Sequence, residues 1–179
     1  LINEILKSLS MPVAYLNGDD ADIKDIISVA EPVKLRTIIG QNKILFIDEA
    51  QKIDNIGTAI KICTDRISDV QVIATGSSSF ELASKTNEAL TGRKYEFFLF
   101  PLSFNELYNH HGYLLEKRSI EQRLIFGSYP EIISKPFEAK DLVKLLAGSY
   151  LYKDIMMLEG IQKPAIFEKL LKAIALQLG

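Results

Sequence analysis

The sequence predicts an α/β fold, in which a parallel sheet is followed by a helical subdomain. Short apolar segments such as 44–47 and 70–74 have the length and composition of strands buried on both faces. Segments with helical periodicity alternate with them, at the spacing of right-handed crossovers between parallel strands. Only helical patterns follow residue 102, so we expect a sheet-containing domain at 1–102 and a helical lid or linker subdomain at 103–179.

The first domain is expected to begin with a helix, because Ile2, Ile5 and Leu6 fall on one helical face. Turn and capping residues at 17–20 introduce a second helix, and Pro32 begins a third that Gly40 closes. The expected elements are, in order, a helix at 1–9, a strand at 13–16, helices at 21–30 and 32–39, a strand at 44–47, a helix at 56–67, a strand at 70–74, a further helix and a strand at 95–99.

The second domain is expected to contain helices throughout. Ser103 and Ser119 are each followed three residues later by Glu or Gln, a capping-box pattern that predicts a helix start at both serines. An apolar stripe predicts a helix over 141–158, and Pro164 is placed to begin a last helix over 165–178.

Composition is that of an ordinary globular protein, with 47% hydrophobic and 25% charged residues. The 21 basic and 23 acidic residues leave a net charge of −2, which offers no bulk attraction for nucleic acid or anionic membranes. Cys63 is the single cysteine, so an intrachain disulfide is excluded and a reducing compartment fits. Without a membrane-spanning or signal-peptide pattern, we expect a cytoplasmic protein.

Two carboxylates, Asp48 and Glu49, follow the apolar strand at 44–47. Ligands of open parallel sheets bind at the carboxyl ends of the strands. A nucleotide hydrolase needs such a pair there, one carboxylate to support Mg²⁺ and a second to deprotonate the attacking water. The alternative is that these acids only cap the next helix.

Hydroxyl residues follow the next apolar strand, about 25 residues later, as expected for one crossover. Neighbouring strands would bring Thr75 and Ser77 beside the two carboxylates, where they can sense a γ-phosphate or hold the attacking water. Ser77 is also a candidate helix cap.

Arg93 lies in a Thr-Gly-Arg turn just before the expected strand at 95–99. An arginine there can stabilise the transferring phosphoryl group, in its own subunit or in a neighbour. It can equally form an ordinary surface ion pair.

Six motifs occur in a fixed order along the chain. They are I-D-E-A-Q at 47–51, A-T-G-S-S-S at 74–79, L-T-G-R at 90–93, F-P-L-S-F-N-E-L at 100–107, F-G-S-Y-P-E at 126–131 and Y-L-Y-K-D-I at 150–155. The ordered set resembles prokaryotic AAA-type P-loop ATPases, related to the signal-transducing NTPases, which also carry a C-terminal nuclease-like domain.

The resemblance implies a three-layer P-loop fold of the ASCE type with strand order 5-1-4-3-2, in which 13–16, 44–47, 70–74 and 95–99 are strands two to five. It implies ATP and Mg²⁺ as ligands, with Asp48 as the metal-supporting Walker B acid and Glu49 as the catalytic glutamate. Thr75 or Ser77 would occupy the sensor position, and Arg93 would be a further catalytic residue.

The expected function is an ATPase core that couples ATP turnover to a conformational switch. The chain departs from the family pattern because no G-x-x-x-x-G-K-[ST] loop is present. The first strand and this loop are expected upstream of Leu1, and the chain as given is expected to bind ATP poorly.

Two other functions are open from the sequence. A nucleotide-dead module could dock a protein or DNA partner through its helical half, and the D-E-A-Q string also fits a superfamily 2 helicase fragment. A homo-oligomer would be required if Arg93 acts on a neighbouring subunit, and DNA binding would depend on domains outside this chain.

Overall fold

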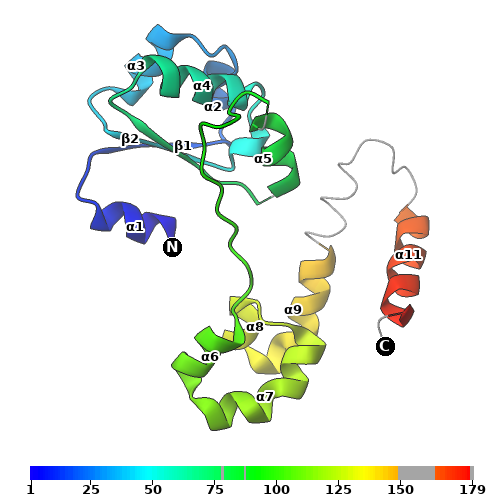
Figure 1. Ribbon diagram of the computed structural model, residues 1–179. Coiled ribbons are helices and arrows are strands. Elements are labelled where there is room, and N and C mark those ends of the chain that lie inside the picture. Colours follow the sequence, from blue (N-terminus) through cyan, green and yellow to red (C-terminus); the bar gives the residue numbers. More distant parts are fainter. Residues whose placement is uncertain (78, 87, 149–163, 178–179) are drawn as a thin grey trace. The chain divides into compact units, whose positions relative to one another are not determined.

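The computed structural model describes residues 1–77, 79–86, 88–148 and 164–177. The chain divides into two compact units, Leu1–Phe98 and Leu99–Gly179 (Figure 1). Among the described residues, no helix is both long and apolar enough to cross a membrane.

The first unit contains a small parallel sheet and the helices around it. Its elements are α1 (Ile2–Ser8), β1 (Val13–Asn17), α2 (Ala21–Ser28), α3 (Pro32–Ile39), β2 (Ile44–Asp48), the short 3-10 helix η1 (Ala50–Lys52), α4 (Ile56–Arg66), β3 (Gln71–Ala74) and α5 (Ser79–Thr86). The strands lie in the order β1-β2-β3, with Leu16 opposite Ile47 and Ile47 opposite Ala74.

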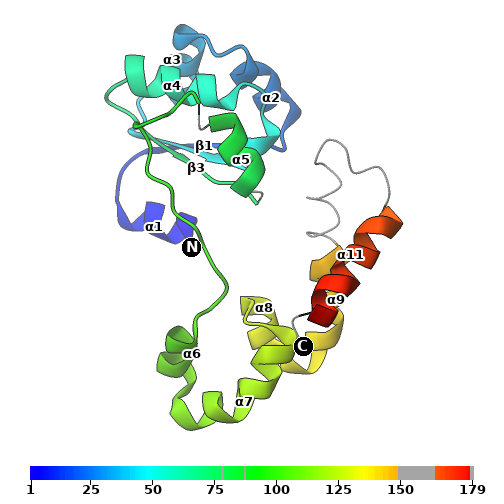
Figure 2. The same ribbon diagram turned by 45° about the vertical axis from the view of Figure 1, so that its right-hand side comes forward.

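Helices cover both faces of this sheet (Figure 2). Leu45 and Ile47 of β2 pack with buried residues of α2, α3 and α4 on one face, and this cluster is the main core. Ile44 and Phe46 point to the other face and pack against Leu6 of α1. The central strand β2 is buried on both faces because its four apolar residues alternate between the two clusters.

The predicted α/β class and the parallel pairing of three strands are confirmed. The predicted strand at 95–99 is wrong, because this segment has irregular backbone and its side chains lie in solvent, with Tyr95 93% and Phe97 91% exposed. A strand requires a neighbour for its backbone hydrogen bonds, and none of the described strands pairs with this segment. The order 5-1-4-3-2 is therefore not observed.

The described residues of the second unit form helices and no strand. They are α6 (Phe104–His111), α7 (Tyr113–Phe126), α8 (Pro130–Ser134), the 3-10 helix η2 (Pro136–Glu138), α9 (Ala139–Leu146) and α11 (Pro164–Gln177). Ile132, Ala139 and Leu142 form the small core of α8 and α9.

One of the two predicted capping boxes is present. The hydroxyl of Ser103 accepts a hydrogen bond from the Glu106 amide, and the Glu106 carboxylate accepts one from the Ser103 amide. The helix start predicted at Ser119 is wrong, because α7 already begins at Tyr113 and the Ser119 hydroxyl donates to the Leu115 carbonyl within the helix. Of the helix predicted over 141–158, residues 149–163 lie outside the described residues.

A buried ion cluster joins the end of α6 to α7. Glu116 is fully buried, with 0% of its surface exposed. Its carboxylate accepts two hydrogen bonds from Arg123, at 3.0 and 3.2 Å, and its Oε1 lies 2.6 Å from Nδ1 of His111. The guanidinium of Arg123, more than any other group, lowers the pKa of Glu116.

Candidate functional site

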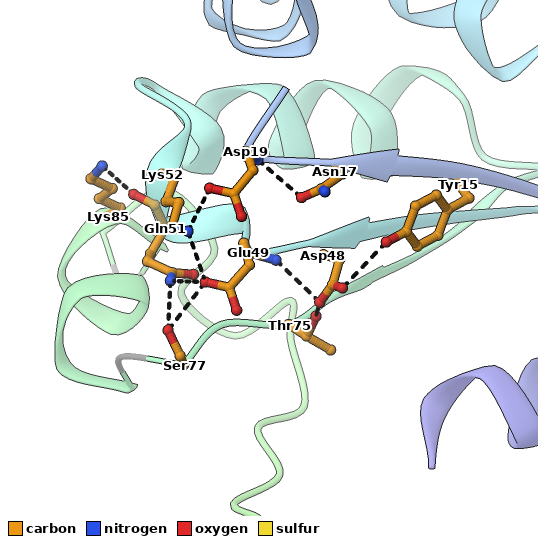
Figure 3. Close-up of polar contacts among 10 residues, drawn as sticks. All are labelled: Tyr15, Asn17, Asp19, Asp48, Glu49, Gln51, Lys52, Thr75, Ser77 and Lys85. Atoms are coloured by element: carbon orange, nitrogen blue, oxygen red, sulfur yellow. Dashed lines mark hydrogen bonds and ion pairs between the residues drawn. The ribbon is translucent and has the colours of Figure 1, made fainter. Parts of the chain in front are cut away.

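The candidate site lies where β2 and β3 end, at the carboxyl edge of the sheet (Figure 3). Hydrogen bonding between the two strands continues past their last paired residues. The Thr75 amide donates to the Ile47 carbonyl at 2.9 Å, and the Ala50 amide donates to the Thr75 carbonyl at 2.8 Å. The two polar segments are therefore held side by side by backbone contacts, which sets the spacing of their side chains.

Asp48 is held by hydroxyl groups from both neighbouring strands (Figure 3). Thr75 Oγ1 donates to Asp48 Oδ1 at 2.6 Å, and the Tyr15 hydroxyl of β1 donates to Asp48 Oδ2 at 3.3 Å. The pKa of Tyr15 is raised, chiefly by burial and to a smaller extent by the negative charge of Asp48. The carboxylate orientation of Asp48 is thus determined by residues that lie 33 and 27 positions away in the chain.

Gly18 allows the loop after β1 to approach this edge. Its amide donates to the Asp48 carbonyl at 2.7 Å, and a Cβ at this position would lie 2.3 Å from the Glu49 carbonyl oxygen. Only glycine therefore fits here without moving the backbone that presents the two carboxylates.

Glu49 has a left-handed backbone conformation, with φ 50° and ψ 39°, which is uncommon for a residue other than glycine. Its Oε2 accepts hydrogen bonds from Gln51 Nε2 at 2.7 Å and from Ser77 Oγ at 3.1 Å. Lys52 Nζ lies 3.6 Å from the same oxygen. The hydrogen bond to Asp19, at 2.5 Å, is the main cause that raises the pKa of Lys52.

Gln51 connects these parts of the site. Its side chain is only 2% exposed, and its Nε2 donates to Glu49 Oε2 and, at 3.1 Å, to Ser77 Oγ. Its backbone carbonyl accepts a hydrogen bond from Lys85 Nζ of α5 at 2.5 Å. Gln51 therefore contacts the polar ends of both strands and the helix that follows β3.

The structure brings together four of the five residues selected from the sequence. Thr75 contacts Asp48, and Ser77 contacts Glu49. Arg93 does not join them, because it pairs with Asp65 through contacts of 2.6 and 2.7 Å. Asp65 lies in the last turn of α4, just before β3 begins, which places Arg93 toward the amino ends of the strands.

Three further residues contact the predicted carboxylates and were not selected from the sequence: Tyr15, Gln51 and Lys52. Tyr15 could have been found from strand alternation, because it pairs with Phe46 and so shares a face with Asp48 two residues later. Gln51 follows the carboxylates in the D-E-A-Q string but reads as an ordinary helix residue. No sequence pattern indicates that its amide is buried.

The donor set fits Mg²⁺ bound together with phosphate. No group of three or more His, Cys, Asp or Glu side chains gathers as a metal site within residues 1–77, 79–86, 88–148 and 164–177. Mg²⁺ commonly takes one or two protein carboxylates and completes its shell with water and phosphate oxygens. Asp48, a single well-oriented carboxylate beside the Thr75 hydroxyl, suits that kind of coordination.

The chain is similar in sequence to one uncharacterized protein and to two family models. The chain is 28% identical over 163 residues to the uncharacterized protein MJ1544 of Methanocaldococcus jannaschii, and the match covers 83% of this chain and 36% of that protein. A domain of unknown function (DUF8612) matches residues 117–179. No solved structure matches the chain.

The family model of the AAA domain matches residues 1–108, which is more than half of the chain and includes each of the five predicted site residues. The chain therefore belongs to the AAA domain family.

Proposed function

We propose that the chain supplies the water-activating half of an ATP-hydrolysing site, in a protein that couples ATP turnover to a conformational switch. The supporting observation is the pairing of each carboxylate with its own hydroxyl at the carboxyl edge, Asp48 with Thr75 and Glu49 with Ser77. Membership of the AAA domain family supports a nucleotide as the ligand.

In this proposal Glu49 is the general base. Its Oε2 is occupied by donors, whereas Oε1 has no hydrogen-bond partner within the part of the chain that the structure describes. Oε1 is therefore the oxygen that accepts a proton from the attacking water, and Ser77 lies close enough to help hold that water.

Asp48 is the residue that would hold Mg²⁺, directly or through a water molecule. The bound ion would neutralise charge on the phosphate oxygens. Thr75 and Tyr15 orient the Asp48 carboxylate, each by donating a hydrogen bond to one of its two oxygens. We further propose that β1, β2 and β3 are strands two, three and four of the order 5-1-4-3-2.

The proposal predicts that Glu49→Gln in the full-length protein leaves ATP binding intact and lowers kcat by about 100-fold or more, because the amide cannot accept the proton. Binding is measured with a fluorescent ATP analogue and turnover by phosphate release. Glu31→Gln is the matched control, since Glu31 is exposed and forms a surface ion pair with Lys34 at 3.2 Å. Turnover of the Glu49→Gln variant within twofold of wild type would exclude Glu49 as the base.

A superfamily 2 helicase is less favoured than an ATPase switch. Residues 99–148 and 164–177 contain helices and no strand, whereas a helicase would begin a second sheet there. Turnover of the full-length protein that rises on addition of RNA would favour the helicase again.

A further inference from the structure

Gln51 has a buried side-chain amide that has no role in the reaction proposed above. Gln51 lies in the short helix η1, and its Nε2 donates both of its hydrogens, one to Glu49 Oε2 at 2.7 Å and one to Ser77 Oγ at 3.1 Å (Figure 3). Ser77 Oγ in turn donates to Glu49 Oε2 at 3.1 Å. These three side chains form a closed ring of hydrogen bonds.

The orientation of this amide is determined by Glu49. If the amide were rotated by half a turn, Gln51 Oε1 would face the carboxylate oxygen of Glu49, and two acceptors would repel each other. In the orientation present, Oε1 is buried and has no hydrogen-bond partner among the described residues. An unpartnered buried acceptor is destabilising, so this side chain is poorly suited to a role in packing alone.

The surroundings of Gln51 keep its amide in place. A Cβ on Gly76 would lie 2.4 Å from Gln51 Oε1, so the absence of a side chain at Gly76 makes room for the amide. Lys85 of α5 donates a hydrogen bond to the backbone carbonyl of Gln51, which holds the main chain of that residue. The loop after β3 and helix α5 thus restrict the amide to the place where it contacts Glu49.

We propose that Gln51 is a positioning residue that holds Oε2 of Glu49 and leaves Oε1 free to take the proton from the attacking water. This inference rests on the proposed function of Glu49 as general base. Gln51 itself touches no reacting atom. It acts through the rotamer of Glu49, because its amide makes the shortest hydrogen bond to Oε2, at 2.7 Å, and Ser77 supports it at 3.1 Å.

The test is Gln51→Met in the full-length protein, because methionine keeps the length of the side chain and removes both donors. We expect kcat for ATP to fall by about tenfold or more while KM stays within about twofold, since a misdirected base slows the chemical step without changing nucleotide contacts. The matched control is Gln71→Met, the same substitution at an exposed position of β3.

Repeating the substitution in the Glu49→Gln variant distinguishes a positioning role of Gln51 from a general loss of structure. In the Glu49→Gln variant, adding Gln51→Met should change the residual turnover by less than about twofold, because a residue that acts through Glu49 has nothing left to position. Circular dichroism establishes that each variant is folded. If Gln51→Met does not fold, Gln51→Asn replaces it, because the asparagine side chain is one methylene shorter and its amide does not reach Glu49.

The outcomes distinguish this inference from the proposed function. If Glu49→Gln loses turnover and Gln51→Met keeps wild-type kcat, Gln51 is not a positioning residue and the base assignment stands. Equal losses from Gln51→Met with and without the glutamate also overturn the inference. A full-length protein that hydrolyses no ATP, or one in which Glu49→Gln stays active, overturns both.

Discussion

At the scale of single residues, the site depends on side chains whose environment differs from that expected in an ordinary loop. Glu49 has a left-handed backbone, and such conformations cost about 1 kcal/mol or more outside glycine. Gln51 is buried, its Oε1 has no hydrogen-bond partner among the residues that the structure describes, and Gly18 and Gly76 leave no room for a Cβ. Such local costs are retained where they hold a chemical group in a required orientation.

Gly76→Ala tests this close packing. The new Cβ would lie 2.4 Å from Oε1 and 3.2 Å from Cδ of Gln51, so the amide has to move away from Glu49. We expect the free energy of unfolding to fall by about 1 to 2 kcal/mol, as in other overpacked sites, and turnover to fall with it. Urea denaturation and phosphate release measure the two effects.

Gly148→Ala is the control, because a Cβ at Gly148 meets no atom of the described residues within 4 Å. If Gly76→Ala is as stable and as active as wild type, the contact between Gly76 and the amide does not hold Gln51 in place.

At the scale of elements, the sheet register brings the site residues together. Ile47 of β2 pairs with Ala74 of β3, so the next residues, Asp48 and Thr75, are neighbours on the same face. This contact was predictable because parallel strands joined by one crossover end at the same edge. The contact between α5 and η1 through Lys85 was not, because it depends on where the helix packs after it leaves β3.

The buried carboxylate of Glu116 pairs with Arg123 of its own helix and contacts His111 at the end of α6. Glu116→Gln would leave the Arg123 guanidinium, whose side chain is 16% exposed, without its charge partner. We expect the free energy of unfolding at pH 7 to fall by about 3 kcal/mol, as for other broken buried pairs. Urea denaturation followed by circular dichroism measures the change.

The free energy of unfolding that Glu116→Gln loses should become smaller as the pH is lowered. Since Arg123 lowers the pKa of Glu116 in the folded protein, its stabilisation is complete above the ordinary glutamate pKa of about 4.3 and is lost as the pH falls through the lowered value. The difference between wild type and Glu116→Gln should therefore shrink in acid. Glu131→Gln is the control, because its pair with Lys135 is exposed and contributes little. A difference that stays constant from pH 7 to pH 3 would contradict the assignment.

At the scale of the whole molecule, the place of Arg93 raises the question of whether its own subunit or a neighbouring subunit supplies the arginine of the proposed ATP site. Its partner Asp65 lies toward the amino ends of the strands, and both side chains are partly exposed, at 49% and 40%. We propose that Arg93 acts on the site of a neighbouring subunit, because it pairs with Asp65 and does not join Asp48 and Glu49. The chain also covers only 36% of the length of its relative MJ1544.

We expect Arg93→Ala in the full-length protein to lower kcat by about 100-fold. Asp65→Asn should leave kcat unchanged, because Asp65 pairs with the arginine from the last turn of α4, away from the carboxyl edge of the sheet. Mixing Arg93→Ala with Glu49→Gln should restore part of the turnover, since each subunit would then supply what its neighbour lacks. Phosphate release measures all three. Wild-type turnover in Arg93→Ala would show that the residue forms only a surface ion pair.

From the sequence one could predict the α/β class, three of the strands, and that Asp48, Glu49, Thr75 and Ser77 lie where strands end, because apolar runs and strand ends are local patterns. The tertiary structure alone decided that 95–99 is no strand, since pairing needs a neighbour that composition cannot supply. It also decided that Gln51 holds Glu49 while Arg93 binds Asp65. Arg93 and Asp65 are 28 residues apart, and the Ser77 hydroxyl that helps to hold the Gln51 amide is 26 residues away. Side-chain contacts between segments so far apart leave no periodic pattern in the chain.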